Sequence, residues 1–247
     1  MFLMGNALSA LKVDAIATSI TFGVAGVWIF AVTTLSDLGI LPVKYTRKVV
    51  HIGTGLVFLP CWTLFKTALG PFLAASVPFL FSIKFALIGL GILRDEKAVK
   101  SMSRTGDARE LLYGPVQYGI IHTLATMLFW RSPVAVAVVC VLCAGDGFAE
   151  VFGRALGKNL PLPWNKSKSW PGSIAMLLFS FVTGSLYLAF FKSLGWYPSM
   201  STPRLLMDLA AGSVAGTLVE SVSPLDWDNV LIFVTTATVG GLLAAMP

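Results

Sequence analysis

Residues 132–152 read Ser-Pro-Val-Ala-Val-Ala-Val-Val-Cys-Val-Leu-Cys-Ala-Gly-Asp-Gly-Phe-Ala-Glu-Val-Phe, an apolar run that ends with two acids. A helix that crosses a bilayer needs about 20 predominantly apolar residues, and this run is long enough. Asp146 and Glu150 are four residues apart, so they share one face of the predicted helix. Acids near the end of a span are costly unless they meet a cation, water or a partner. The run therefore predicts a membrane helix with a functional site at its end.

The whole chain has this apolar character. It contains 247 residues, of which 56% are hydrophobic and 12% charged, whereas a soluble domain carries about 25% charged residues. Because helices satisfy their backbone hydrogen bonds internally, the sequence predicts an all-α, polytopic membrane helix bundle of seven or eight transmembrane helices, folded as a single domain over residues 1–247. The candidate spans are 14–35, 49–65, 71–92, 112–130, 132–152, 171–191, 205–223 and 228–246.

The lysines and arginines are distributed unequally between the predicted loops. Loops after the first, third and fifth spans hold twelve of them, the other face holds five, and Lys84 lies inside the third span. Basic loops favour the cytoplasm-equivalent side, so both termini are predicted on the opposite side. The net charge of +6 thus reflects topology, and no nucleic-acid partner is expected. The polar-rich segments 44–51, 94–110, 145–170 and 220–229 all fall on the positive face.

Two of these segments precede the acidic run and carry candidate phosphate ligands. Arg47 and Lys48 stand at a span entrance, where they either anchor the helix or bind phosphate. His51, one turn later, could bind phosphate or shuttle a proton. Arg104 and Arg109 either belong to a solvated loop with internal salt bridges or present guanidinium groups to phosphate oxygens.

The segments 145–170 and 220–229 carry the remaining candidates. Asp146 and Glu150 could hold Mg²⁺, although Asp146 could instead form a buried ion pair with Arg154. Nearby donors for a polyphosphate are Lys158, Asn165, Lys166 and Lys168. Trp164 and Trp170 either stack on a base or lie at the membrane interface. The acids Glu220, Asp226 and Asp228 form a polar turn, or they complete the metal site or orient a hydroxyl group.

Four motifs in order resemble the polyprenol kinase family, with the phytol and farnesol kinases of plants and cyanobacteria the most similar. They are Arg47-Lys48-x-x-His51, Arg104-x-Gly106-Asp107-x-Arg109-Glu110, Gly145-Asp146-Gly147-x-Ala149-Glu150-x-x-Gly153-Arg154 and Asn165-Lys166-x-Lys168-Ser169-Trp170-x-Gly172-Ser173. The family's terminal Glu and Asp-Asn pattern is matched by Glu220 and Asp228-Asn229. One departure is Glu150, where the family more often has Asp.

The resemblance implies a multi-pass enzyme that phosphorylates a long-chain isoprenoid alcohol, most simply phytol, with CTP as donor and a divalent metal. Asp146, Glu150 and Glu220 are then the expected metal ligands, and His51 and Asp228 are alternatives for the base. Arg47, Lys48, Arg104, Arg109, Lys158, Asn165, Lys166 and Lys168 are the expected donor-binding residues. A chloroplast envelope membrane is the expected location, although no transit peptide is visible.

Other functions remain open from the sequence. The acceptor could be farnesol or geranylgeraniol, the donor could be UTP, and the oligomeric state is undetermined. A membrane CTP:lipid-phosphate cytidylyltransferase would use a similar site. An anion transporter is the alternative of another class, but transporters place charges near the midplane and often show two related halves. Here the charges lie at one predicted surface, and the halves 1–123 and 124–247 do not resemble each other.

Overall fold

The computed structural model describes residues 2–224 and 226–246, without the side chains of residues 2–8 and 44. The side chain of Lys44, which the charge count includes, therefore lies outside the described part. Within these residues the chain is all-helical, and its only β-type pairing is an isolated bridge between Pro161 and Ser169. The predicted all-α fold is confirmed. The chain forms two compact units, Met1–Trp130 and Arg131–Pro247, which are described separately. The single domain over 1–247 stays a prediction.

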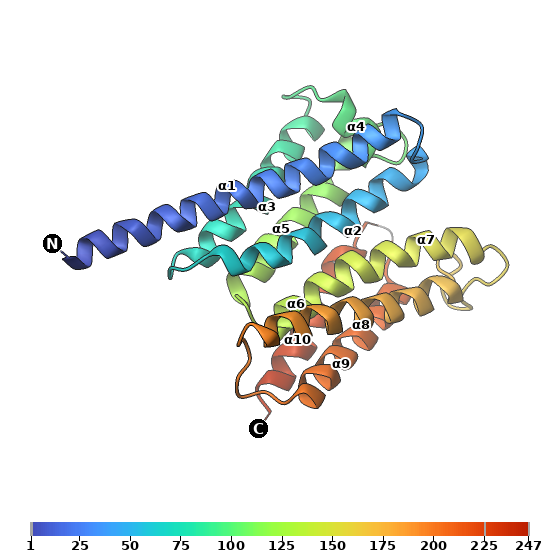
Figure 1. Cartoon of the computed structure of the whole chain (residues 1–247). Helices are drawn as coiled ribbons and strands as arrows, with labels where there is room; N and C mark the ends of the chain where they lie inside the picture. Colours follow the sequence, from blue (N-terminus) through green and yellow to red (C-terminus); the bar gives the residue numbers. More distant parts are fainter. Residues whose placement is uncertain (1, 225, 247) are drawn as a thin grey trace. The chain divides into compact units, whose positions relative to one another are not determined.

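Unit 1 contains α1 (Phe2–Asp37), α2 (Val43–Cys61), α3 (Gly70–Gly89), α4 (Glu96–Met102) and α5 (Gly114–Leu128), with 3-10 turns at Trp62–Leu64 and Ala108–Leu112. The long α1 runs beside α2 and α3, and α3 packs on α5 (Figure 1). Part of the hydrophobic core of unit 1 forms where these helices meet the short α4. The buried residues there are Val32, Val50, Phe85, Ile88, Ala98, Met102 and Leu111.

Ion pairs and hydrogen bonds to carboxylates tie unit 1 together. Lys84, which the sequence left either paired or snorkelling, contacts Asp95 just beyond the end of α3 at 2.9 Å. Lys100 of α4 contacts Asp37 at the end of α1 at 2.8 Å. These pairs bring the segments before α2 and around α4 to one end of the unit, whereas their shared face of the membrane stays a prediction.

Unit 2 contains α6 (Pro133–Cys140), α7 (Asp146–Leu156), α8 (Trp170–Ser193), α9 (Thr202–Val222) and α10 (Asp228–Ala244). A π turn over Val141–Gly145 joins α6 to α7 in one continuous helical rod, Pro133–Leu156. Helices α8, α9 and α10 all contact α6 or the π turn, so the apolar rod is the centre of this unit (Figure 1). Small residues and valines in α6 permit this close packing.

Each of the eight predicted spans corresponds to a helix. Five helical segments in the described chain are long and apolar enough to cross a membrane: Ser9–Asp37, Gly70–Gly89, Pro133–Leu156, Trp170–Ser193 and Thr202–Val222. The remaining three are polar or short: α2 carries basic residues in its first turns, α5 has 15 residues and α10 has 17. A helical membrane bundle is therefore supported, whereas the count of seven or eight spans stays a prediction.

Candidate functional site

Asp146 is the first residue of α7, directly after the π turn. Single π turns interrupt α-helices rarely and occur frequently at functional sites. Asp146 lies inside unit 2 on the apolar rod, and it is only 5% exposed. A buried carboxylate must be hydrogen-bonded or paired, so its surroundings decide what it can do.

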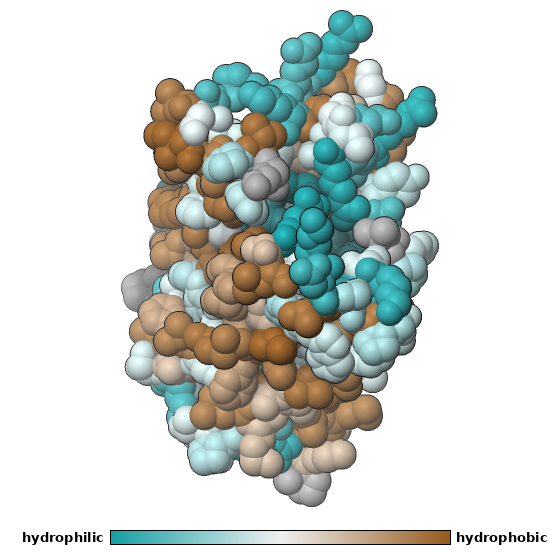
Figure 2. Space-filling view, turned by 90° about the vertical axis from the view of Figure 1, so that its right-hand side faces the viewer, coloured by the Kyte–Doolittle hydropathy of each residue, from teal (hydrophilic) through white to brown (hydrophobic). Residues whose placement is uncertain are grey.

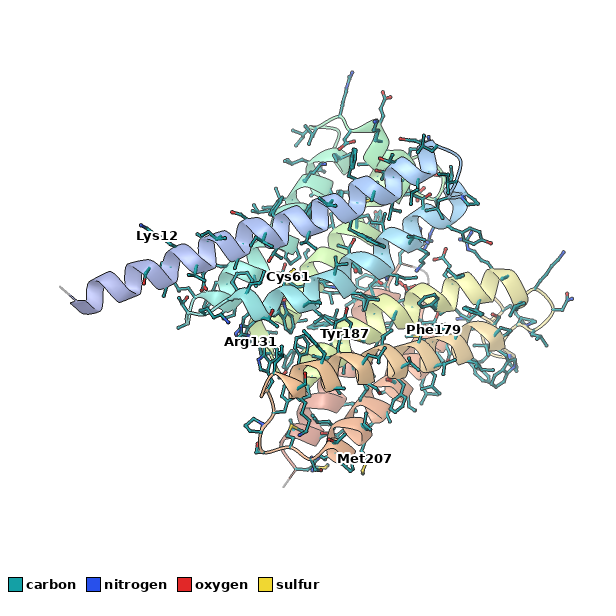
Figure 3. All side chains as sticks on the ribbon, in the orientation of Figure 1. Lys12, Cys61, Arg131, Phe179, Tyr187 and Met207 are labelled. Carbon is teal, nitrogen blue, oxygen red and sulfur yellow. The ribbon has the colours of Figure 1, made fainter. Side chains whose placement is uncertain are left out.

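Glycines bring the π turn and the end of α7 close to α8 and the residue before it. A Cβ atom added to Gly145 would lie 2.2 Å from Ser180 Oγ, and one added to Gly157 would lie 2.3 Å from Ser169 Oγ. Between these two positions, the rings of Phe148 and Phe179 stack with centroids 3.9 Å apart. Phe179 is labelled on α8 in Figure 3. Only glycine permits the first two approaches, so these positions determine where Asp146 stands relative to α8.

The chain between α7 and α8 folds into a small hairpin, residues 160–170. Leu162 N donates to Lys168 O at 2.9 Å, and Trp170 N donates to Leu160 O at 3.0 Å. The side chain of Leu162 is fully buried and anchors the hairpin. Asn165 Oδ1 accepts hydrogen bonds from the backbone and hydroxyl of Ser167, which shapes the tip. The basic loop predicted from the sequence is therefore an ordered structure.

The hairpin docks on the last turn of α9. Trp164 Nε1 donates to Ser221 Oγ at 3.3 Å, and Asn165 Nδ2 donates to Ser223 O at 3.4 Å. Trp164 and Trp170 are both about half exposed, with ring centroids 5.7 Å apart. Figure 2 shows the side of the molecule that lies at the right in Figure 1, where hydrophilic and hydrophobic side chains are exposed side by side. Both the base-stacking and the interfacial interpretation of the tryptophans remain compatible with this exposure.

Lys168 lies among three carboxylates. Its Nζ contacts Glu220 Oε1 of α9 directly and lies 3.8 Å from Asp228 Oδ2 at the start of α10. Burial acts to lower the pKa of Lys168, but the charge and hydrogen bond of Glu220, followed by the charges of Asp146 and Asp228, outweigh it and raise the pKa. Lys168 is therefore a charged, largely buried ammonium group.

The predicted metal ligands differ in their surroundings. Glu150 Oε1 contacts Arg154 Nη2 at 2.7 Å, one turn along α7, and Glu220 contacts Lys168. Within the described residues no group of three His, Cys, Asp or Glu side chains is arranged to hold a metal ion. Mg²⁺ is usually held by one or two carboxylates plus substrate phosphates, so Asp146 with one further acid still fits it. The set Asp146, Glu150 and Glu220 stays a prediction.

The predicted donors in unit 2 also divide into two kinds. Lys158 and Lys166 are exposed, whereas the side chain of Lys168 is 14% exposed. Asn165 uses its amide group to hold the hairpin. The structure therefore brings Asp146, Lys168, Glu220 and Asp228 together, and it leaves the two exposed lysines at the surface beside them.

In unit 1, the motif at the start of α2 meets α5. Lys48 is 5% exposed, and Arg47 and His51 are partly buried. The ring of Tyr118 of α5 lies against the His51 ring at a tilt of 47°, with centroids 4.4 Å apart, and its hydroxyl donates to His51 O at 2.6 Å. Sequence reasoning missed Tyr118, although Tyr118 and His122 are four residues apart on one face of α5 and their rings also meet.

The other motif of unit 1 forms a tight turn before α5. Glu110 accepts hydrogen bonds from the backbone of Arg104 and Thr105, and Asp107 caps the following 3-10 turn by accepting from Arg109 N at 2.8 Å. Burial raises the pKa of Glu110, but the hydrogen bond from the Thr105 hydroxyl, followed by those from the backbone N–H groups of Arg104 and Thr105, outweighs burial and holds the pKa below its usual value. The side chains of Arg104 and Arg109 are exposed, as phosphate ligands or solvated residues would be.

Comparisons with known proteins identify relatives over nearly the whole chain. A rice protein named probable phytol kinase 2, chloroplastic, is 42% identical over 95% of this chain and 78% of its own length. An Arabidopsis thaliana farnesol kinase, chloroplastic, is 39% identical over 98% of this chain and 78% of its own length. Arabidopsis thaliana phytol kinase 1, chloroplastic, is 33% identical over 94% and 77%.

No family model matches the chain, and no solved structure matches it. The three relatives nevertheless share at least 33% of their residues with this chain over at least 77% of their own length. The predicted resemblance to their family is therefore confirmed. Their names also agree with the predicted chloroplast membrane. The chain belongs to the family of phytol and farnesol kinases, membrane enzymes that transfer a phosphoryl group to an isoprenoid alcohol.

Proposed function

We propose that this protein phosphorylates phytol with CTP as the phosphoryl donor, in a chloroplast membrane. The observation that carries the proposal is the position of Asp146: a buried carboxylate at the end of an apolar rod, beside a hairpin that presents exposed lysines. A kinase for a lipid alcohol needs this combination, because its acceptor dissolves in the bilayer and its donor is a polyanion in water. The relatives named phytol kinase and farnesol kinase support the same chemistry.

The reaction is a direct phosphoryl transfer. The alcohol oxygen forms a bond to the γ-phosphorus while the bond from that phosphorus to the β,γ-bridging oxygen breaks, and CDP leaves. The hydroxyl proton passes to a base, for which His51 and Asp228 are the candidates. Such transfers depend on positioning and on neutralising charge, so no covalent enzyme intermediate is required.

The residues have separate tasks in this proposal. Mg²⁺, when held by Asp146 with Glu150 or Glu220 and by the donor phosphates, supplies positive charge at the transferring group. The exposed Lys158 and Lys166 attract and neutralise the triphosphate from the water side. The resemblance to the kinase family also assigns Arg47, Lys48, Arg104 and Arg109 to donor binding.

The acceptor tail needs no water-filled pocket. Unit 2 exposes apolar side chains along α8 and α9, including Leu186 and Leu218, as helices in lipid do. A tail that is itself lipid-soluble can approach between helices while its hydroxyl group reaches the polar end. Tail length would be read through apolar volume, which discriminates by only about 1–3 kcal/mol per methylene. Farnesol and geranylgeraniol are therefore the competing acceptors.

An isotope experiment tests the function. Purified protein in detergent is incubated with phytol, or in a parallel reaction with a lipid phosphate, and with CTP that carries label on either the γ- or the α-phosphate. A kinase transfers only the γ label to lipid, whereas a lipid-phosphate cytidylyltransferase transfers the α label to a lipid phosphate. Repeating the γ-label assay with farnesol, geranylgeraniol, UTP and ATP ranks acceptors and donors. Failure to transfer label to any of these alcohols would refute the proposal.

A further inference from the structure

The two lysines of the hairpin have different surroundings, although they are only two residues apart. Lys166 is exposed at the tip, whereas Lys168 points into unit 2. The hairpin backbone explains the difference, because Lys168 O and N are both used to close it, to Leu162 N at 2.9 Å and to Asn165 O at 3.0 Å. This pairing fixes the direction in which the Lys168 side chain leaves the backbone.

Lys168 meets acids that come from other elements. The side chains of Glu220, on α9, and Asp228, at the start of α10, are 5% and 16% exposed, and both face the Lys168 ammonium group. Asp146, on α7, adds a third negative charge close enough to act on it. Four segments of unit 2 therefore converge on one ammonium group.

Without the Lys168 ammonium group, the buried carboxylates of Glu220 and Asp228 would lose their positively charged partner. A buried charge that loses its partner is strongly destabilising, more so when like charges face each other. For the same reason, Lys168 cannot turn toward a phosphate without leaving the buried Glu220 carboxylate unpaired, which would destabilise unit 2. Lys166 has no such constraint, since it lies at the surface of the hairpin tip.

We propose that Lys168 is a positioning residue, which holds the hairpin and the carboxylates of Glu220 and Asp228 in place, and that Lys166 is the hairpin lysine that meets the donor phosphates. The inference rests on the proposed function. It revises the sequence-based expectation, which treated both lysines as donor ligands. It predicts that substitutions of the two lysines differ in kind and not only in size.

The test compares Lys168→Met with Lys166→Met in the full chain in detergent. The readouts are the KM for CTP, kcat, and hydrogen exchange of the backbone amides of residues 160–170. Lys166→Met should raise the KM for CTP several-fold with unchanged amide exchange. Lys168→Met should lower kcat by about tenfold or more and speed amide exchange in the hairpin at least tenfold, because its docking is lost. Lys168→Arg, which keeps the charge, should restore much of the protection.

A double-mutant cycle with Glu220→Gln then measures the coupling. If Lys168 and Glu220 act as a pair, the double variant should lose little more hairpin protection than either single variant. Additive losses would overturn the proposal, as would a Lys168→Met variant that shows a raised KM for CTP and unchanged amide exchange. If Lys168→Met does not fold, Glu220→Gln alone must speed hairpin exchange, and unchanged exchange would overturn the proposal.

These outcomes are distinguishable from failure of the proposed function. Hydrogen exchange and thermal unfolding measure the Lys168–Glu220 pair without any substrate. If the wild-type protein transfers no label from CTP but shows the coupling, the kinase proposal is refuted. The Lys168–Glu220 pair is then a structural contact only, and the proposed positioning role is refuted as well. Active wild-type protein without the coupling would refute the positioning role alone.

Discussion

Replacing Gly145 with alanine should both destabilise unit 2 and slow the reaction. The added Cβ would lie 2.2 Å from Ser180 Oγ, far inside van der Waals contact, at the residue that precedes Asp146. To relieve the overlap, the buried Ser180 hydroxyl must rotate away or the π turn and α8 must move apart, and overpacking of this kind costs about 1–3 kcal/mol. The better helix propensity of alanine returns up to about 1 kcal/mol. If Asp146 is displaced by about 1 Å, kcat should fall on the order of 10²-fold.

A second substitution makes the reasoning falsifiable. Ser180 Oγ is buried and has no hydrogen-bond partner among the described residues, so Ser180→Ala should be neutral or slightly stabilising. In Gly145→Ala/Ser180→Ala the next neighbour of the added Cβ is Met176 Cγ at 3.2 Å, a flexible side chain that can adjust. The double variant should therefore recover most of the stability and of kcat.

Thermal unfolding in detergent and kcat per mole of folded protein are the measurements. Gly241→Ala serves as the matched control, because a Cβ there meets nothing within 4 Å on α10. It should unfold at the wild-type temperature or slightly above. The steric argument fails if Gly145→Ala behaves like Gly241→Ala, or if removing the Ser180 hydroxyl restores nothing.

Three further outcomes are expected. Asp146→Asn should lower kinase activity at least about 10²-fold at near-normal membrane abundance, and full activity would remove Asp146 from the site. In a variant without the three native cysteines, cysteines at positions 105 and 160 should be labelled from the same side of the membrane, whereas opposite accessibility would exclude the eight-span topology. Asp14→Ala should lower the unfolding temperature, because this fully buried carboxylate accepts from Lys66 N, Thr67 N and Thr67 Oγ1; unchanged unfolding would show that these hydrogen bonds contribute little.

The helical segments could be predicted from the sequence because apolar run length is a local property. Each of the eight runs corresponds to a helix, and the run that carries Asp146 is the central rod of unit 2. The π turn at Val141–Gly145 could not be predicted in the same way. Its surroundings come from distant parts of the chain: Ser180 of α8, which a Cβ atom on Gly145 would meet at 2.2 Å, lies 35 positions later.

The roles of Lys166 and Lys168 show where local patterns stop being informative. Both are lysines in one polar loop beside two acids, so charge alone assigns both to phosphate binding. The distinction arises from a backbone bridge within the hairpin and from Glu220, which lies 52 residues away in sequence. An assay of activity alone would show a loss for either lysine substitution and would not distinguish the two. Because one loss would weaken donor attraction and the other would release buried carboxylates, only KM, kcat and hairpin exchange measured together identify which contact was removed.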